Sequence, residues 1–359
     1  MFTNLQKRLR LSEVVKSVDP FELFHSQPNT SELILQHFSS GELLNLFSVS
    51  KQWNGILSNS KKCMDKFKFV FSQIPWTNDW NEKTLEMLNT SRRYRHVNGH
   101  FVYTTVAVNI LKLLENSRMS PIFLDVRIDN ENGFYGRAPL PDSFNFPQIE
   151  SLNIQSVLSS ALKIKLISST SRLRKLSVDS IMSAGLVKCL INLKNLKELQ
   201  LHGHKEYIFK QPTLQHAKFA LKSLKFTDSS KLSDEAQINY GEFFKKMSSS
   251  LISLHLDFAY NYDLELLLNY LPNLRLITVR TIKEDVSRLQ FSPNRNIKEF
   301  RIFELSDVFK KIIISLRNLE VLHIEIFTAA DYKWVVQNSR KLKMCSYQFL
   351  KVPSYEQVI

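Results

Sequence analysis

Glycine and cysteine are scarce in this 359-residue chain, which contains eight and three of them respectively. So few glycines argue against glycine-rich phosphate loops and against flexible linkers. The cysteines, Cys63, Cys189 and Cys345, are far apart and odd in number, which fits neither a disulfide framework nor a zinc site. We therefore expect free thiols, buried or half-buried, in a reducing compartment, either the cytoplasm or the nucleus.

Long apolar runs and catalytic motifs are missing as well. No segment approaches the roughly 18 apolar residues of a membrane helix, and the N-terminus has neither the apolar run nor the cleavage site of a signal peptide. The motifs G-x-x-x-x-G-K, G-x-G-x-x-G, G-x-S-x-G, H-E-x-x-H and paired C-x-x-C do not occur. His202 and His204 are close together but have no acidic or cysteine partner at ligand spacing. These absences predict that the protein is not an enzyme, has no catalytic residue, cofactor or metal, and does not contact a membrane.

Positive charge is in excess and is unevenly divided. The formal net charge is +14; residues 1–90 contain ten lysines and arginines against nine acidic residues, whereas residues 91–359 contain 38 against 25. A basic surface favours acidic partners, whether protein or nucleic acid. The basic residues are scattered along the chain rather than gathered in one run with interleaved aromatics. This favours a solubilising surface over nucleic-acid binding.

A six-residue phrase, apolar-x-x-apolar-x-apolar, returns through the second half of the chain at intervals of 22 to 30 residues. Leu342 opens a degenerate last copy, and weaker early copies start at Tyr94 and Phe123. Regular self-similarity of this kind is typical of a repeat array. The clear copies are IESLNI, LRKLSV, LKELQL, LKSLKF, LISLHL, LRLITV, IKEFRI and LEVLHI, which begin at Ile149, Leu173, Leu196, Leu221, Leu251, Leu274, Ile297 and Leu319.

Each copy combines a short strand with a helix. The last two apolar residues of the phrase are two apart and therefore lie on one face of an extended segment. Helix-like stretches separate the phrases, and one strand with one helix cannot bury its own apolar face, whereas stacked copies can. The 30-residue interval between Leu221 and Leu251 marks an insertion, TDSSKLSDEAQINYGEFF, which we expect to protrude as a loop.

This pattern resembles the leucine-rich repeat over residues 94–359. The resemblance implies an α/β solenoid with parallel strands on its concave side and helices on its convex side. Function in such an array belongs to the strand residues between the apolar ones, although any solvated sheet face shows a similar mixed polarity. The candidate substrate-binding patch places charge around an aromatic anchor and consists of His255, Asp257, Arg280, Arg301, Phe303 and His323.

The stretch ELILQHFSSGELLNLFSVSKQW, residues 32–53, follows a different rule. Its apolar residues recur at helical intervals, as at Leu43 and Phe47. A first short helix is expected to end at Phe38, and Ser40 is the expected N-cap of the next helix. A helical group of about thirty residues cannot bury enough surface alone. It therefore needs the repeat array or a partner to cover it.

These residues resemble the F-box motif. The family has an acidic residue, an aliphatic helix ending in Phe, a short loop, an acidic-Leu-Leu step and a Val-Cys-Lys-x-Trp segment. The chain departs from the family at His37, normally aliphatic, and at Ser50, normally cysteine, and its loop before the acidic step is short. The corresponding residues here are Glu32, Leu33-Ile34-Leu35, Phe38, Glu42-Leu43-Leu44 and Val49-Ser50-Lys51-Gln52-Trp53.

An F-box followed by leucine-rich repeats defines a class of substrate receptors in SCF-type cullin-RING ubiquitin ligases. The resemblance implies that a helical module over residues 28–72 docks on the Skp-family adaptor, and through it on a cullin. The solenoid over residues 94–359 is then expected to bind a protein substrate, favoured to be acidic. Leu46, Phe47 and Val49 are expected only to hold the helices together. The resemblance assigns adaptor contact to Leu33, Ile34, Phe38, Leu43, Leu44 and Trp53.

The sequence leaves two other functions open. The departures at His37 and Ser50 are compatible with a non-ligase leucine-rich-repeat scaffold, in which the N-terminal helices merely cap the solenoid. The positive charge of residues 91–359 motivates RNA binding as a third alternative, with a steep dependence of affinity on salt as its signature.

Overall fold

The chain divides into two compact units in a computed structural model. One unit comprises Met1–Val126 and Gly133–Pro139, and the other comprises Arg127–Asn132 and Leu140–Ile359. The first unit thus extends past the predicted helical module. The structure describes residues 33, 35–72, 88, 93–117, 119–130, 141–156, 160–179, 184–203, 205–283, 296–326, 328–339 and 341–347.

Strands and helices alternate along the chain, and the predicted α/β repeat architecture is confirmed. Within the described residues, twelve strands form one sheet in which each strand neighbours the next in chain order. The pairings are parallel, from β1 with β2 to β11 with β12. The strands are β1 (Lys68–Ser72), β2 (His96–Tyr103), β3 (Phe123–Asn130), β4 (Ser151–Ser156), β5 (Lys175–Asp179), β6 (Glu198–His202), β7 (Ser223–Phe226), β8 (Ser253–Ala259), β9 (Leu276–Ile282), β10 (Glu299–Glu304), β11 (Val321–Ile326) and β12 (Met344–Tyr347).

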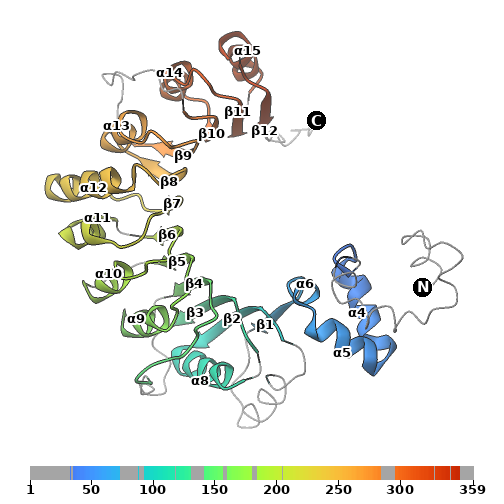
Figure 1. Cartoon of the computed structure of the whole chain (residues 1–359). Coiled ribbons are helices and arrows are strands. Elements are labelled where there is room, and N and C mark those ends of the chain that lie inside the picture. Colours follow the sequence, from blue (N-terminus) through green and yellow to red (C-terminus); the bar gives the residue numbers. More distant parts are fainter. Residues whose placement is uncertain are drawn as a thin grey trace, which may run out of the picture. The chain divides into compact units, whose positions relative to one another are not determined.

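Helices lie in most of the intervals between successive strands, as the sequence predicts. In the second unit, β4 to β12 line the inner side of an arc and the helices lie on its outer side (Figure 1). The helices are α4 (Ser40–Val49), α5 (Lys51–Asn59), α6 (Lys61–Met64), α8 (Thr104–Glu115), α9 (Ser160–Ser168), α10 (Ala184–Leu190), α11 (Lys205–Phe209), the 3-10 helix η2 (Pro212–His216), α12 (Asp234–Met247), α13 (Asn261–Asn269), α14 (Asp307–Ser315) and α15 (Ala329–Asn338).

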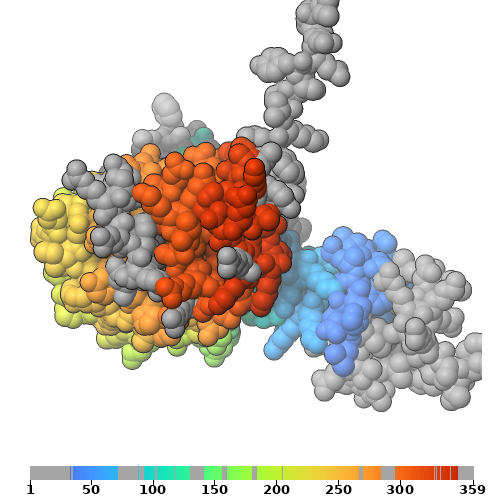
Figure 2. Space-filling view, turned by 90° about the horizontal axis from the view of Figure 1, so that it is seen from above, coloured from blue at the N-terminus to red at the C-terminus, as the bar shows by residue number. Residues whose placement is uncertain are grey.

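The apolar residues of the repeated phrase form the core of the second unit. All three apolar positions of the eight clear phrases are buried, as at Leu221, Leu224 and Phe226. The parallel register stacks like on like, because Leu224 lies opposite Leu199 on one side and Leu254 on the other. Burying a side chain of this size contributes about 1.5–3 kcal/mol. From above, the C-terminal repeats form a continuous packed surface (Figure 2).

The insertion between Leu221 and Leu251 does not protrude as a loop, so that expectation is wrong. Most of it forms α12, a helix of 14 residues. Its buried residues Ala236, Tyr240, Phe243, Phe244 and Met247 recur three and four apart, which gives the helix an apolar face to set against its neighbours. The extra residues therefore lengthen the convex helix instead of leaving the array.

A fully buried ion pair holds the segment that precedes α12. Both Lys205 and Asp263 are completely inaccessible to solvent, and the Lys205 Nζ lies 3.2 Å from the Asp263 Oδ2. The backbone N–H of Lys205 donates to the buried carboxylate of Asp228 over 2.5 Å. Asp228 also accepts from the backbone N–H of Ser230 over 3.0 Å. These contacts join residues from three successive repeats.

Three tyrosine rings surround the ammonium of Lys205. Its Nζ lies 5.8, 5.3 and 5.5 Å from the ring centroids of Tyr240, Tyr260 and Tyr262, within the range of cation–π attraction. The Tyr240 hydroxyl donates to Asp263. Complete burial and the adjacent carboxylate raise the pKa of Tyr240 well above its ordinary value, so the phenol stays protonated and can donate. The cage thus compensates a charge that would otherwise be costly to bury.

Removal of Asp263 should therefore destabilise the second unit. We expect Asp263→Ala to lower its free energy of unfolding by about 3–5 kcal/mol, because the change leaves the Lys205 ammonium buried without its counter-charge. Urea denaturation followed by circular dichroism measures the change. The double variant Lys205→Met/Asp263→Leu should recover most of the loss, and a loss equal to that of the single variant would contradict the ion-pair explanation.

Candidate functional site

The N-terminal helices α4, α5 and α6 enclose a small apolar core. The amphipathic pattern of the sequence turns one side of each helix toward this core. Phe38, Ile56, Phe67 and Tyr94 pack at its margin. The buried residues of this cluster are Leu35, Leu43, Leu46, Phe47, Trp53, Leu57, Cys63 and Met64.

Serine caps begin the three helices of this group. Ser39, and not the expected Ser40, is the N-cap of α4, and it forms a capping box with Glu42. In this box the backbone N–H of Ser39 donates to the Glu42 carboxylate over 2.8 Å. Ser50 caps α5 by accepting from the backbone N–H of Trp53 over 3.2 Å, and Ser60 caps α6. Ser50, where the F-box pattern has cysteine, therefore caps a helix in this chain.

A lysine fixes the turn that leads into α4. The ammonium of Lys66 donates to the backbone carbonyls of Gln36, over 2.6 Å, and of Phe38. Lys62 donates to the side chain of Gln36 over 3.3 Å. The short loop before Glu42 is thus tied to the end of α6 and positioned by it.

Four of the six predicted adaptor-contacting residues divide into an exposed pair and a buried pair. Leu33 and Leu44 are 53% and 51% exposed, whereas Leu43 and Trp53 are buried in the helical core. Phe38 is half-buried at the margin of that core, and Ile34 lies outside the described residues. Leu46 and Phe47 are buried as expected of packing residues. Val49 differs from them, because it is 49% exposed and so cannot act mainly in packing.

The concave face carries the second candidate site, and the register aligns its residues in one row. His255 lies opposite Thr278, Thr278 opposite Arg301, Arg301 opposite His323, and His323 opposite Ser346. These residues stand at the fifth position of successive phrases, and the first four stand between two buried apolar positions. The strand period therefore turns all of them to the same face.

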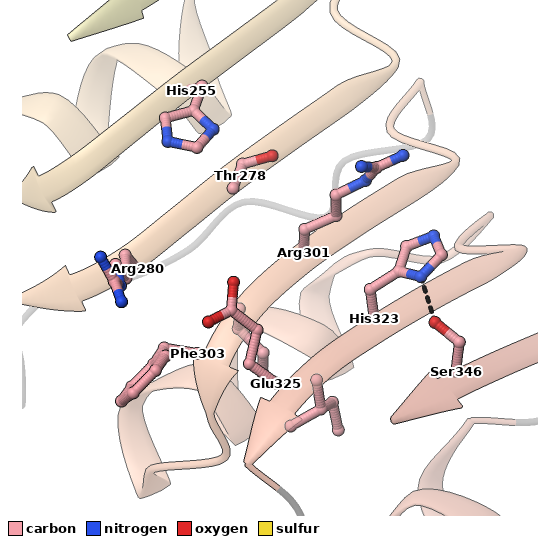
Figure 3. Close-up of a pocket in the computed structure, with 10 residues that line it drawn as sticks. His255, Thr278, Arg280, Arg301, Phe303, His323, Glu325 and Ser346 are labelled. Atoms are coloured by element: carbon pink, nitrogen blue, oxygen red, sulfur yellow. Dashed lines mark hydrogen bonds between the residues drawn. The ribbon is translucent and has the colours of Figure 1, made fainter. Parts of the chain in front are cut away.

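A hollow of about 480 Å³ opens on this part of the concave face. Of the six residues predicted for substrate binding, five line it, and Asp257 contacts one of them. Arg280 and Phe303 lie at one side, and His323 and Ser346 lie at the other (Figure 3). The residues that line the hollow are His255, Thr278, Arg280, Arg301, Ile302, Phe303, His323, Ile324, Glu325 and Ser346.

One carboxylate at the margin of the hollow holds two of its side chains. Arg301 binds the Glu299 carboxylate, with Nε 2.7 Å and a terminal nitrogen 2.5 Å from Oε1. The Nε2 of His323 lies 3.2 Å from the same oxygen. Glu299 was not singled out from the sequence, although it stands two residues before Arg301 and therefore on the same strand face. Two residues of the hollow thus share one carboxylate.

Arg280 lies over the aromatic ring of Phe303. Its guanidinium carbon lies 5.0 Å from the centroid of the Phe303 ring, at cation–π distance. The neighbouring Asp257 accepts a hydrogen bond from His255 over 2.6 Å. This hydrogen bond, and then the positive charges of Lys225 and Arg280, lower the pKa of the Asp257 carboxyl against the opposing effect of burial. An exposed guanidinium stacked on an aromatic ring is typical of residues that dominate protein interfaces.

A histidine network lies further along the same face. The Nε2 of His202 is 2.8 Å from Gln200 Nε2 and 3.1 Å from Ser177 Oγ, and its Nδ1 is 2.9 Å from Thr227 Oγ1. Because the Gln200 amide nitrogen only donates, the ring Nε2 accepts. Burial, and then the charge of Lys225, lower the pKa of His202 below its ordinary value. The network therefore binds the neutral ring.

The described residues show neither a metal site nor a membrane-spanning helix. They contain no group of three or more His, Cys, Asp and Glu side chains placed to hold a metal ion. No helix among them is long and apolar enough to cross a membrane. The three cysteines are free; Cys63 is buried, and Cys189 and Cys345 are half-buried. No known family model matches the chain, and no curated protein matches it either.

Protonation of His202 should weaken the fold. Its folded-state pKa is lowered, so the folded protein binds fewer protons there than the unfolded chain, and stability falls as pH drops through about 6.5. We expect the urea midpoint to decrease between pH 7.5 and 5.5, and to decrease less in His202→Gln, whose amide keeps hydrogen-bonding capacity. An identical pH dependence in both proteins would show that His202 does not contribute.

Proposed function

We propose that this protein is the substrate-recognition subunit of an SCF-type ubiquitin ligase. The observation that supports the proposal most strongly is that one chain combines a small helical group with a parallel repeat sheet. A small capped helical group presents exposed leucines, and a parallel repeat sheet bears an open hollow lined by charge and one aromatic ring. The first suits a constant adaptor and the second suits a substrate. The F-box resemblance of residues 32–53 points to the Skp-family adaptor, and through it a cullin, as the partner.

The difference in exposure between the leucines refines the proposed adaptor contact. In this proposal Leu33 and Leu44 contact the adaptor directly, joined by Val49, since all three side chains are about half exposed. Leu43 and Trp53 act from within by holding α4 and α5 at a fixed angle. Each exposed leucine that the adaptor covers contributes at most about 1.5–3 kcal/mol before ordering costs. The caps at Ser39 and Ser50 keep these costs low, because the helices are already formed.

The hollow on the concave face is the proposed substrate contact. Arg280 on Phe303 forms its anchor, and this exposed guanidinium favours an acidic residue in the substrate segment. The proposed contribution to ubiquitin transfer is proximity and orientation, because holding a substrate beside the transferring subunits raises its effective concentration. The chain itself need not perform chemistry and is proposed not to be an enzyme.

Adaptor binding can be tested with neighbouring leucines that differ in burial. Leu44→Asp should reduce adaptor affinity at least tenfold, because it places a charge on the exposed contact surface. It should change stability by only about 0.5 kcal/mol, as surface substitutions usually do. Co-purification with the Skp-family adaptor and biolayer interferometry measure binding, and thermal denaturation measures stability.

Leu43→Asp is the matched contrast, because it buries a carboxylate in the helical core and should unfold that core. Failure of the wild-type chain to bind the adaptor, under conditions in which another F-box protein binds, would sink the ligase proposal. Global unfolding by Leu44→Asp would instead favour the scaffold alternative, in which the helices only cap the solenoid.

Substrate capture provides the second test. Arg280→Ala/Phe303→Ala should remove bound substrate proteins, measured by quantitative mass spectrometry of affinity-purified complexes, while adaptor recovery stays unchanged. The matched control is Lys311→Ala/Tyr207→Ala, which removes an exposed cation and an exposed aromatic from the helices. Equal losses of substrate in both double variants would show that the hollow is not the recognition site.

A further inference from the structure

Positive charge is concentrated in one short segment of seven of the nine repeats. Consider the five residues that end with the second residue of each phrase, from 146–150 through 339–343. These nine segments contain 13 of the 48 lysines and arginines of the chain but only two of its 34 acidic residues. Most of the net charge of +14 therefore originates in one structural position that carries cations in seven of the nine repeats.

The sheet brings these segments together at the edge where its strands begin. The backbone N–H of Lys197 donates to the Arg174 carbonyl over 2.8 Å, Lys222 to Lys197 over 2.8 Å, Ile252 to Lys222 over 2.9 Å, and Arg275 to Ile252 over 2.9 Å. Neighbouring strands lie about 4.8 Å apart. We call this row the basic edge; its described cations are Arg172, Arg174, Lys194, Lys197, Lys218, Lys222, Arg275, Lys298, Arg317, Lys341 and Lys343.

Two glutamates show that side chains along this edge reach one another. Glu150 lies 3.8 Å from Arg174 at one end. At the other end Glu320 bridges Lys298 and Lys343, over 3.2 and 2.8 Å. Among the described residues, the cations of the basic edge that pair with these carboxylates lie toward its two ends.

The cations at the centre of the basic edge are not neutralised by described carboxylates. Among the residues that the structure describes, no carboxylate lies within ion-pair distance of Lys197, Lys222 or Arg275. Elsewhere along the edge, neutral acceptors hold the cations: Lys218 donates to the Asn192 side chain over 3.3 Å, and Arg172 donates to a glutamine oxygen over 3.3 Å. Such contacts position a cation without cancelling its charge, so the field remains available to an anionic partner.

The side chains along the basic edge indicate whether a nucleic acid or an acidic peptide suits it better. Single-stranded nucleic acids are held by bases stacked on aromatic side chains, yet the only aromatic residues in these segments, Phe146 and Phe219, are buried. An apolar side chain, Ile252, is 40% exposed between Lys222 and Arg275. An apolar contact between cations suits a peptide side chain better than a phosphodiester backbone.

We propose that the basic edge binds an extended acidic segment of a partner protein, with an apolar residue of that segment on Ile252. The distance from Arg174 to Arg275 is four strand spacings, about 19 Å, which about six residues of extended chain span at 3.3 Å each. This surface lies at the beginning of the strands and is built from other residues than the concave hollow. The inference goes beyond the proposed function and does not require the chain to be a ligase subunit.

Fluorescence anisotropy tests the proposal with the full chain and a labelled 20-residue peptide rich in aspartate and glutamate with one central leucine. Lys197→Glu/Lys222→Glu/Arg275→Glu should weaken binding at least tenfold, because it reverses the uncompensated centre of the edge. Added salt should weaken wild-type binding. Ile252→Ser should weaken binding of this peptide severalfold, with no effect on a peptide whose leucine is replaced by serine.

The matched control is Lys188→Glu/Lys311→Glu/Lys333→Glu, which changes net charge equally at exposed lysines of α10, α14 and α15. It should alter affinity less than twofold. Equal weakening by both triple variants would overturn the proposal in favour of a net-charge effect. Absence of wild-type binding at low salt would also overturn it, as would tighter binding of an oligouridine of equal charge that depends on the edge. Circular dichroism melting verifies that each variant is folded.

Discussion

The stacking of each repeat's three apolar residues on those of the next repeat is the constraint on which the second unit depends. A strand and a helix of about 23 residues cannot bury an apolar face alone, so every copy relies on its neighbours. The pairing of Leu199, Leu224 and Leu254 shows how the parallel register meets this need, because like positions lie opposite one another. A slip by one residue would turn the whole apolar set to solvent.

A register that aligns the core also aligns whatever stands between the core positions. Arg301 and His323 come together because both occupy the fifth position of a phrase, although 22 residues separate them. The same rule turns cations that are scattered in the sequence into one edge. Lys197, Lys222 and Arg275 form no run along the chain, and a search for charge runs therefore favours a diffuse solubilising surface. Periodic spacing in a parallel array is the physical reason that they are neighbours.

The N-terminal helical group shows which structural features the residue pattern predicts and which it does not. The helical periodicity after Ser40 predicts helix there, and the structure divides this helix at Ser50 into α4 and α5. It does not distinguish Leu43 from Leu44, of which the first is fully buried and the second half exposed. That difference depends on where α5 and α6 cross α4, which is a property of three-dimensional packing. The cap at Ser39 instead of Ser40 is a shift of one residue that local chemistry leaves open.

The sequence by itself determined the repeat, its strand-and-helix composition and the face on which the polar strand residues lie, because periods of about 23 and of two are local properties. It also indicated five of the residues that line the concave hollow. Only the tertiary structure decided that the insertion before Leu251 is a helix, since its apolar face gains a partner from neighbouring repeats. The Lys205–Asp263 pair and its tyrosine cage arise in the same way, because their members are up to 58 residues apart and meet only when the repeats stack.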